Sequence, residues 1–326
     1  MSYRTIKGYQ PSAQLALLLA FTGMGVVIAS FLQLSVAQIL IPPGLPLSKM
    51  DEAVLQVLSD PANAGYIRLA QGLGAMAIFL MPALLVNYIT QGKSFFWLGF
   101  NAQVNLPQLI FGFLLIIAAN FISAPVDETV KWVVMHFPSL DSKAVSLEKA
   151  YIENLQAMGV IHGGWDFILS LFIMALLPAL FEEVFFRGLL QQLFVRWWGR
   201  PMLGILAASL VFSLVHASIY LFAGRAILGF ALGYMFYLSK NIWLNVVAHF
   251  LNNAVAVFQL YWVSRGNGQP IDTQSKFNPL TDYWFALMAV IAAYFVYKAL
   301  VKWSAKNNSL IENRESALLT QAASLM

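Results

Sequence analysis

Two adjacent carboxylates and an arginine stand at the end of a long apolar run. The segment Pro178-Ala-Leu-Phe-Glu-Glu-Val-Phe-Phe-Arg-Gly188 contains Glu182, Glu183 and Arg187. An ionisable group inside an apolar span marks a functional site by default. Glu183 and Arg187 are four positions apart, so a helix places them on one face, where they can pair. Glu182 points about 100° away and has no nearby cation, which leaves it available as a general base.

Two histidines also lie inside apolar spans. His216 stands near the end of Leu210-Val-Phe-Ser-Leu-Val-His-Ala217, and His249 belongs to a stripe with a polar residue at every fourth position. Lipid cannot satisfy amide groups, so this stripe has to face the bundle interior or water. Its members are Asn241, Asn245, His249 and Asn253, with Asn252 at the edge. Interhelical hydrogen bonding is an alternative role for the first two asparagines.

The composition indicates an integral membrane protein. Of the 326 residues, 60% are hydrophobic and 10% are charged, whereas a soluble domain carries about 25% charged residues. The net charge of +4 fits Lys and Arg on the cytoplasmic side and gives no reason to expect nucleic-acid binding. The absence of cysteine excludes disulfides, thiol catalysis and cysteine-ligated metals.

Apolar runs long enough to span a membrane predict an all-α, polytopic helical bundle in the cell (cytoplasmic) membrane. A span needs about 20 apolar residues, which gives about eight: 13–41, 65–90, 106–126, 165–189, 202–221, 224–239, 242–263 and 281–302. With the N-terminus inside, the distribution of Lys and Arg and the even count place both termini in the cytoplasm. Long connections are expected at 42–64, 127–163 and 264–280, and the second is expected to hold an interfacial helix.

The turn between the fourth and fifth spans allows an estimate of depth. Glu182 lies seventeen positions before Gly199, and His216 lies seventeen positions after it. If both arms are helical, the two side chains lie level, about 25 Å from the turn at 1.5 Å per residue. His136 and His162 fall in loops and are interpreted as ordinary loop residues.

Three short motifs occur in order in separate spans: Glu182-Glu183-x-x-x-Arg187, Phe212-x-x-x-His216 and His249-x-x-x-Asn253. This pattern resembles the CAAX-protease and bacteriocin-processing family, also called CPBP or Abi, which includes the eukaryotic Ras-converting CAAX endopeptidase. The resemblance covers about residues 165–260. We therefore expect four parts: helices and a long non-cytoplasmic loop in 1–164, a protease core in 165–260, a loop and last helix in 261–303, and a flexible cytoplasmic tail in 304–326.

The resemblance implies an intramembrane endopeptidase whose partners are membrane lipid and a peptide or protein substrate, lipidated in one version. It implies that Glu182 activates a water molecule with help from His216. It also implies that His249 and Asn253 form the oxyanion hole. The supporting residues would be Glu183 and Arg187, which hold the site together, and Phe212, which packs beside the first histidine.

Amide hydrolysis requires a base for the water, an acid for the leaving amine and donors for the oxyanion. A carboxylate, two imidazoles and an amide supply these groups without a cofactor. One carboxylate with two histidines also matches a zinc site, with Glu182, His216 and His249 as ligands. In the zinc version, Glu183 is the only carboxylate left to act as the base, and it is expected to pair with Arg187. We therefore prefer the metal-free version.

Two further classes of function remain as alternatives. One is a non-proteolytic membrane protein, such as a bacteriocin-immunity or scaffold factor, that has kept the helical bundle. The other is a transporter that uses Glu182 and the histidines as a proton relay. Against the transporter, the sequence has no pair of Gly- or Pro-broken spans in two matching halves.

Overall fold

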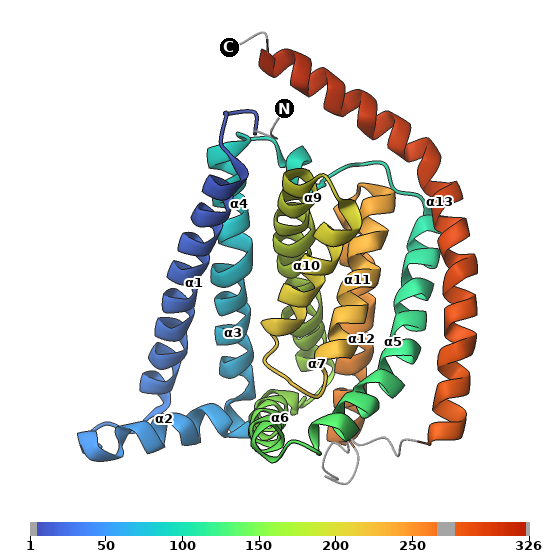
Figure 1. The fold of residues 1–326 in the computed structure, drawn as a ribbon. Helices are drawn as coiled ribbons and strands as arrows, with labels where there is room; N and C mark the ends of the chain where they lie inside the picture. The colour runs from blue at the N-terminus through green and yellow to red at the C-terminus, as the bar shows by residue number, and fades with distance from the viewer. Residues whose placement is uncertain (1–4, 266–277, 324–326) are drawn as a thin grey trace.

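The computed structural model describes residues 5–265 and 278–323, and the regular elements in these ranges are all helices. Most of them run side by side in one bundle, and α2 and α6 lie across one end of it (Figure 1). The expected all-α membrane bundle is thereby confirmed. The bounds are α1 (Pro11–Leu40), α2 (Met50–Ser59), α3 (Ala64–Ala75), α4 (Met81–Thr90), α5 (Leu106–Val134), α6 (Pro138–Gly159), α7 (Gly164–Ser170), α8 (Leu177–Glu183), α9 (Gln192–Trp198), α10 (Pro201–Leu214), α11 (Phe222–Ser239), α12 (Ile242–Arg265) and α13 (Pro279–Ala323).

In the described part of the chain, seven helices are long and apolar enough to cross a membrane. The eighth expected span, 202–221, is shorter than predicted. Its helix, α10, has 14 residues, which gives a length of about 21 Å at 1.5 Å per residue. The hydrocarbon core is about 30 Å thick, so α10 ends inside the bundle and residues 215–221 form a turn there (Figure 1).

Three π-helical turns interrupt the spans. Met76–Leu80 precedes Pro82, and Leu171–Leu176 precedes Pro178. Proline lacks the N–H for the helical hydrogen bond and clashes with the carbonyl four residues earlier, and a wider turn before it relieves both problems. The third turn, Val184–Gln191, begins directly after Glu183 and joins α8 to α9 in one continuous helical span, Gly164–Trp198.

The catalytic candidates belong to the middle of the bundle. Figure 1 shows α1 with α3–α4 at one edge and α5 with α13 at the other, and the helices from α7 to α12 lie between them. The largest buried apolar cluster includes Phe186, Phe212, Phe236 and Leu98. Gly188 belongs to the same region, where a Cβ atom would lie 2.8 Å from the carbonyl oxygen of Leu98. Only glycine therefore allows the span with the two glutamates to approach the short 3₁₀ helix Phe95–Leu98 so closely.

The two ends of the bundle carry different helix ends and connecting segments. α1 begins and α13 ends at the same end, where the turn between α9 and α10 also lies (Figure 1). The opposite end carries α6, which occupies part of the expected interfacial segment. Residues 304–323, expected as a flexible tail, instead continue α13, and Ile311 packs on Phe96 and Trp97. Most of the expected loop 264–280 lies outside the described residues.

The cytoplasmic position of the termini is a prediction that single cysteines can test, because the chain has none. Lys93→Cys and Arg200→Cys would mark the end with the termini, and Ser142→Cys would mark α6; all three positions are exposed. In intact cells, we expect a membrane-impermeant maleimide to label only Ser142→Cys. Lys93→Cys and Arg200→Cys should react only after permeabilisation. The reverse pattern would place the termini on the outside.

Candidate active site

Glu183, the last residue of α8, is completely buried and accepts hydrogen bonds from three side chains. Arg187 Nη1 lies 2.9 Å from Oε1, and Asn245 Nδ2 lies 3.1 Å from Oε2. His249 Nδ1 lies 2.8 Å from Oε1. A buried carboxylate is tolerated only when a cation and hydrogen-bond donors surround it. The contact with Arg187 agrees with the i, i+4 spacing, whereas the two contacts that join Glu183 to α12 were not predicted.

Arg187 connects the same carboxylate to two further helices. Its side chain is 2% exposed, and Nη2 donates to the carbonyl oxygen of Gly229 on α11 at 3.1 Å. The guanidinium carbon lies 4.7 Å from the ring centre of Phe212 on α10, within range of a cation–π contact. A Cβ atom at Gly229 would lie 3.1 Å from that ring. The glycine therefore allows α11 to pack close to α10.

His249 stands between the two glutamates. Its Nδ1 contacts Glu183, and its Nε2 lies 4.0 Å from Oε2 of Glu182. A carboxylate oxygen can only accept, so Nδ1 carries the hydrogen of this bond. The side chain of Glu182 is 13% exposed, whereas that of Glu183 has no exposed surface. Of the two adjacent carboxylates, Glu182 is therefore the one that a small molecule can reach.

His216 lies in the turn after α10, not in a helix. Its Nδ1 is 2.7 Å from the carbonyl oxygen of Phe212. A carbonyl only accepts, so Nδ1 carries the hydrogen, and Nε2 of the neutral ring holds a lone pair. The ring of Phe212 is 4.8 Å from that of His216 and 6.1 Å from that of His249. Phe212 thus packs beside both histidines.

The depth estimate for Glu182 and His216 rested on two regular helical arms, and this premise is wrong. α10 ends at Leu214, and the other arm contains the π-helical turn Val184–Gln191. The rise of an α-helix therefore does not apply along either arm. In the described chain, no hydrogen bond or ion pair joins Glu182 directly to His216.

The polar stripe of α12 faces the bundle interior, as expected. Nδ2 of Asn241 donates to the carbonyl oxygens of Asn101 and Gln103, each at 3.0 Å. Nδ2 of Asn245 donates to the carbonyl oxygen of Leu232 at 2.7 Å as well as to the carboxylate described above. Asn245 therefore has the interhelical role that was the alternative to a catalytic one, whereas Asn241, directly before α12, bonds the connection that leads into α5.

The far end of the stripe is less constrained. Asn252 accepts a hydrogen bond from Asn120 of α5 at 2.7 Å. Asn253 is half-buried and follows His249 by one helical turn, so both lie on the same face of α12. Its carboxamide has no hydrogen-bond partner among the residues that the structure describes. Asn253 is thus available to bind a group from outside the chain.

The residues proposed as zinc ligands do not form a common site. Within the described residues, no three His, Asp or Glu side chains are grouped so that they could hold one metal ion. Nδ1 of His216 and Nδ1 of His249 are engaged in hydrogen bonds, which leaves Nε2 of each ring available, as in histidines that bind a metal through Nε2. The alternative in which Glu182, His216 and His249 bind zinc therefore stays a prediction.

A second buried ion pair was missed by the sequence reasoning. Arg68 of α3 is 3% exposed, and Nη1 lies 2.9 Å from Oδ1 of Asp166 on α7. Nη2 also donates to the carbonyl oxygen of Val160 at 3.0 Å. The available signal was one charged residue near the beginning of each expected span, 65–90 and 165–189. His136 and His162 lie outside the site, as expected, and His162 contributes only its backbone N–H to Asp166.

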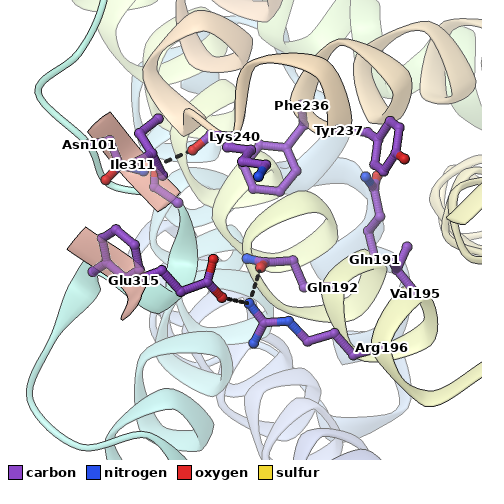
Figure 2. A pocket seen from close by; sticks show the side chains of 12 residues that line it. Asn101, Gln191, Gln192, Val195, Arg196, Phe236, Tyr237, Lys240, Ile311 and Glu315 are labelled. Carbon is purple, nitrogen blue, oxygen red and sulfur yellow. Dashed lines mark hydrogen bonds and ion pairs between the residues drawn. The ribbon is translucent and has the colours of Figure 1, made fainter. Parts of the chain in front are cut away.

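A pocket lined by both apolar and polar side chains opens at the end of the bundle that carries the termini, away from these residues. It has a volume of ≈ 230 Å³ and lies beside α9 and α13 (Figure 2). Figure 2 shows Arg196 between Gln192 and Glu315, at 3.0 Å and 3.9 Å respectively. None of the proposed catalytic side chains lines this pocket. It is therefore separate from the candidate active site.

A comparison with protein-family models gives one result that bears on this site. Residues 163–255 match a model described as "Type II CAAX prenyl endopeptidase Rce1-like". The matched region begins just before α7, ends within α12 and contains all the candidate residues: Glu182, Glu183, Arg187, Phe212, His216, His249 and Asn253. No curated protein and no solved structure matched the chain.

Glu183→Gln should strongly destabilise the protein, because it leaves Arg187 buried without its anion. Removing one partner of a buried ion pair costs about 3–5 kcal/mol. Glu182→Gln is the matched control, since it makes the same change one residue away at a partly exposed carboxylate. Thermal unfolding in detergent, followed by tryptophan fluorescence, should show a much lower Tm for Glu183→Gln alone. Equal Tm values for the two variants would contradict the structural role of Glu183.

Proposed function

We propose that this chain hydrolyses a peptide bond within the membrane, a proposal supported by the match of residues 163–255 to the Rce1-like CAAX endopeptidase family model. The observation that carries the proposal is the placement of His249 between two carboxylates. Glu183 holds one ring nitrogen at 2.8 Å, and Glu182 lies 4.0 Å from the other. An accessible carboxylate is suited to act as a base, and an imidazole fixed beside it is suited to donate a hydrogen bond to a developing oxyanion.

In the proposed reaction, Glu182 takes a proton from a water molecule, and the resulting hydroxide attacks the carbonyl carbon of the scissile bond. His216 assists because the lone pair on Nε2 can accept a hydrogen bond from the same water. The attack gives a tetrahedral intermediate with negative charge on the former carbonyl oxygen. When the C–N bond breaks, the proton held by Glu182 passes to the leaving amine. One water is consumed, and a carboxyl and an amine terminus are produced.

The proposed oxyanion donors are His249 and Asn253, which follow each other by one turn of α12. Nε2 of His249 donates when the ring carries both protons, and the carboxylate of Glu183 at Nδ1 balances this charge. The free Nδ2 of Asn253 supplies the second donor. Donors fixed before the reaction stabilise the developing charge without reorganisation. Arg187 acts only through Glu183, whose position it fixes.

The proposed substrate is the C-terminus of a peptide or protein. In one form of the proposal, this substrate carries a lipid group. An apolar groove of ≈ 540 Å³ lies beside α8 and supports this class of substrate. Its apolar walls include Leu80, Leu84, Phe100, Leu180 and Trp243. Such a groove can hold an apolar segment of the substrate.

Glu182→Ala and His216→Ala should each abolish cleavage while the protein still folds. Membranes from cells with the wild-type protein and with Glu182→Ala would first be compared for altered protein C-termini. An internally quenched peptide spanning the identified cleavage site would then serve as substrate for purified protein. Loss of the general base should lower kcat by about 10²–10⁴-fold. Full activity in either variant, at unchanged Tm, would refute the assignment.

Asn253→Ala should lower kcat by about 10²–10³-fold if its amide binds the oxyanion. Asn241→Ala is the matched control on the same stripe, because the Asn241 side chain bonds only the backbone of Asn101, Gln103 and Trp243 and does not contact His249. Both variants would be assayed with the same quenched peptide. Equal kcat losses would indicate a general effect on α12 instead of oxyanion binding.

Cleavage should also persist after dialysis against a strong chelator, because the proposed reaction uses no metal. The control is re-addition of Zn²⁺ to the treated protein, which should not raise kcat. Loss of activity on chelation and its recovery with Zn²⁺ would instead favour the zinc version.

A further inference from the structure

We infer that Arg225, in the first turn of α11, is a positioning residue that holds His216 in its working orientation. The inference rests on the proposed function, because it assumes that His216 takes part in the reaction. It concerns the His216 turn, defined as residues 215–221 between α10 and α11. Helix α6, which lies across the end of the bundle, also holds this turn.

The His216 turn needs external support. α10 stops at Leu214, and the backbone N–H groups of His216 and Ala217 bond carbonyls three residues back, as in a tight turn, instead of four residues back as in an α-helix. The next residue, Ala217, has φ of 50°, in the left-handed region that side-chain-bearing residues rarely adopt. Such a conformation persists only when the surrounding structure holds it in place. The hydrogen bond from Nδ1 to Phe212 sets the rotation of the imidazole, and the position of the histidine backbone depends on contacts that the turn makes with other elements.

Arg225 makes the contact closest to the histidine. Its Nη1 donates to the carbonyl oxygen of His216 itself, at 3.2 Å. The guanidinium carbon lies 5.1 Å from the ring centre of Tyr151 on α6, within cation–π range. Arg225 forms no ion pair with any carboxylate in the ranges 5–265 and 278–323. This half-buried arginine is therefore placed by its hydrogen bond to His216, its contact with Tyr151 and the attraction of the Asp127 carboxylate, without a direct ion pair.

The backbone directly before Arg225 is itself fixed by hydrogen bonds. The backbone N–H of Gly224 donates to Oδ1 of Asp127 on α5 at 2.7 Å. Ser123, on the same helix, donates to the carbonyl oxygen of Gly224 at 3.1 Å. A Cβ atom at Gly224 would collide with the Asp127 carboxylate, so glycine is required for this approach. The first turn of α11 is thereby anchored to α5, and the arginine reaches the histidine from a fixed point.

Helix α6 holds the other half of the turn. The hydroxyl of Tyr220 donates to Oδ1 of Asp141 at 2.6 Å. Burial, together with this hydrogen bond to Asp141, raises the pKa of Tyr220 to about 12, so the hydroxyl remains a donor at physiological pH. Ser218 donates to Glu148 at 3.4 Å. The turn that carries His216 is thus held by α6 at one end and by α11 at the other.

The test compares Arg225→Gln and Arg225→Lys with Arg265→Gln as the matched control. Arg265 is also stacked on a tyrosine, Tyr261, at 5.5 Å, but it lies at the end of α12 and does not contact His216. Two readouts would be measured on the purified full-length protein. The first is amide hydrogen exchange of residues 213–222 by mass spectrometry, and the second is kcat and KM for the quenched peptide.

For Arg225→Gln, we expect faster exchange in the turn, a kcat lowered by about 10–100-fold, and a KM close to that of the wild type. Arg225→Lys, which keeps a charged donor, should recover part of kcat. Arg265→Gln should match the wild type in both readouts. Tyr220→Phe, which removes only the hydroxyl bonded to Asp141, should also accelerate exchange and lower kcat.

Wild-type kcat in Arg225→Gln, while His216→Ala is inactive, would overturn the positioning role and leave the proposed function standing. Full activity in His216→Ala would instead refute the proposed function. Hydrogen exchange would still decide whether Arg225 holds the turn in that case. The Tm of each variant would be measured as well. If Arg225→Gln and Arg225→Lys lower kcat to the same extent and also lower Tm to the same extent, the effect is general destabilisation, and this result would also overturn the inference.

Discussion

One completely buried carboxylate determines how the central helices of this bundle meet. Glu183 is bonded to Arg187 in its own helical span and to Asn245 and His249 on α12. Arg187 in turn bonds the backbone of Gly229 on α11 and lies over Phe212 on α10. Removal of a charge from water is tolerated only if such partners surround it. The site therefore assembles only when four helical segments take these relative positions.

The same requirement divides the roles of two neighbouring carboxylates. Both oxygens of Glu183 are occupied by donors, so it is poorly placed to take up a proton from water. Glu182 is partly exposed and lies 4.0 Å from Nε2 of His249. Glu183, whose two oxygens are both hydrogen-bonded, holds one side of the His249 imidazole, and the accessible Glu182 faces the other side. Adjacent residues of identical chemistry thus acquire different functions from their surroundings alone.

Local patterns in the sequence predicted the parts of this arrangement that depend on local geometry. Apolar run lengths predicted the bundle, and the spacing of Glu183 and Arg187 predicted their pair. Sixty-six positions separate Glu183 from His249, and no local periodicity reports which helix faces meet over that distance. The end of α10 at Leu214 was also missed, because residues 215–221 are as apolar as a helical span. Their hydrogen bonds to α6 join residues 70 and 79 positions apart, which local patterns do not report.

The candidate active site therefore has two halves that are held by different forces. The half with the glutamates, Arg187 and His249 is fixed by buried charges, and any shift there would separate an ion pair in a low-dielectric interior. The half with His216 is an irregular turn fixed by hydrogen bonds to α6 and α11. Hydrogen bonds of this kind, in which one partner is charged, contribute about 1.5–3 kcal/mol each, whereas breaking a buried ion pair costs about 3–5 kcal/mol. The turn is thus the more weakly held half of the site, and its geometry depends on Arg225 and α6 more than the charged half does.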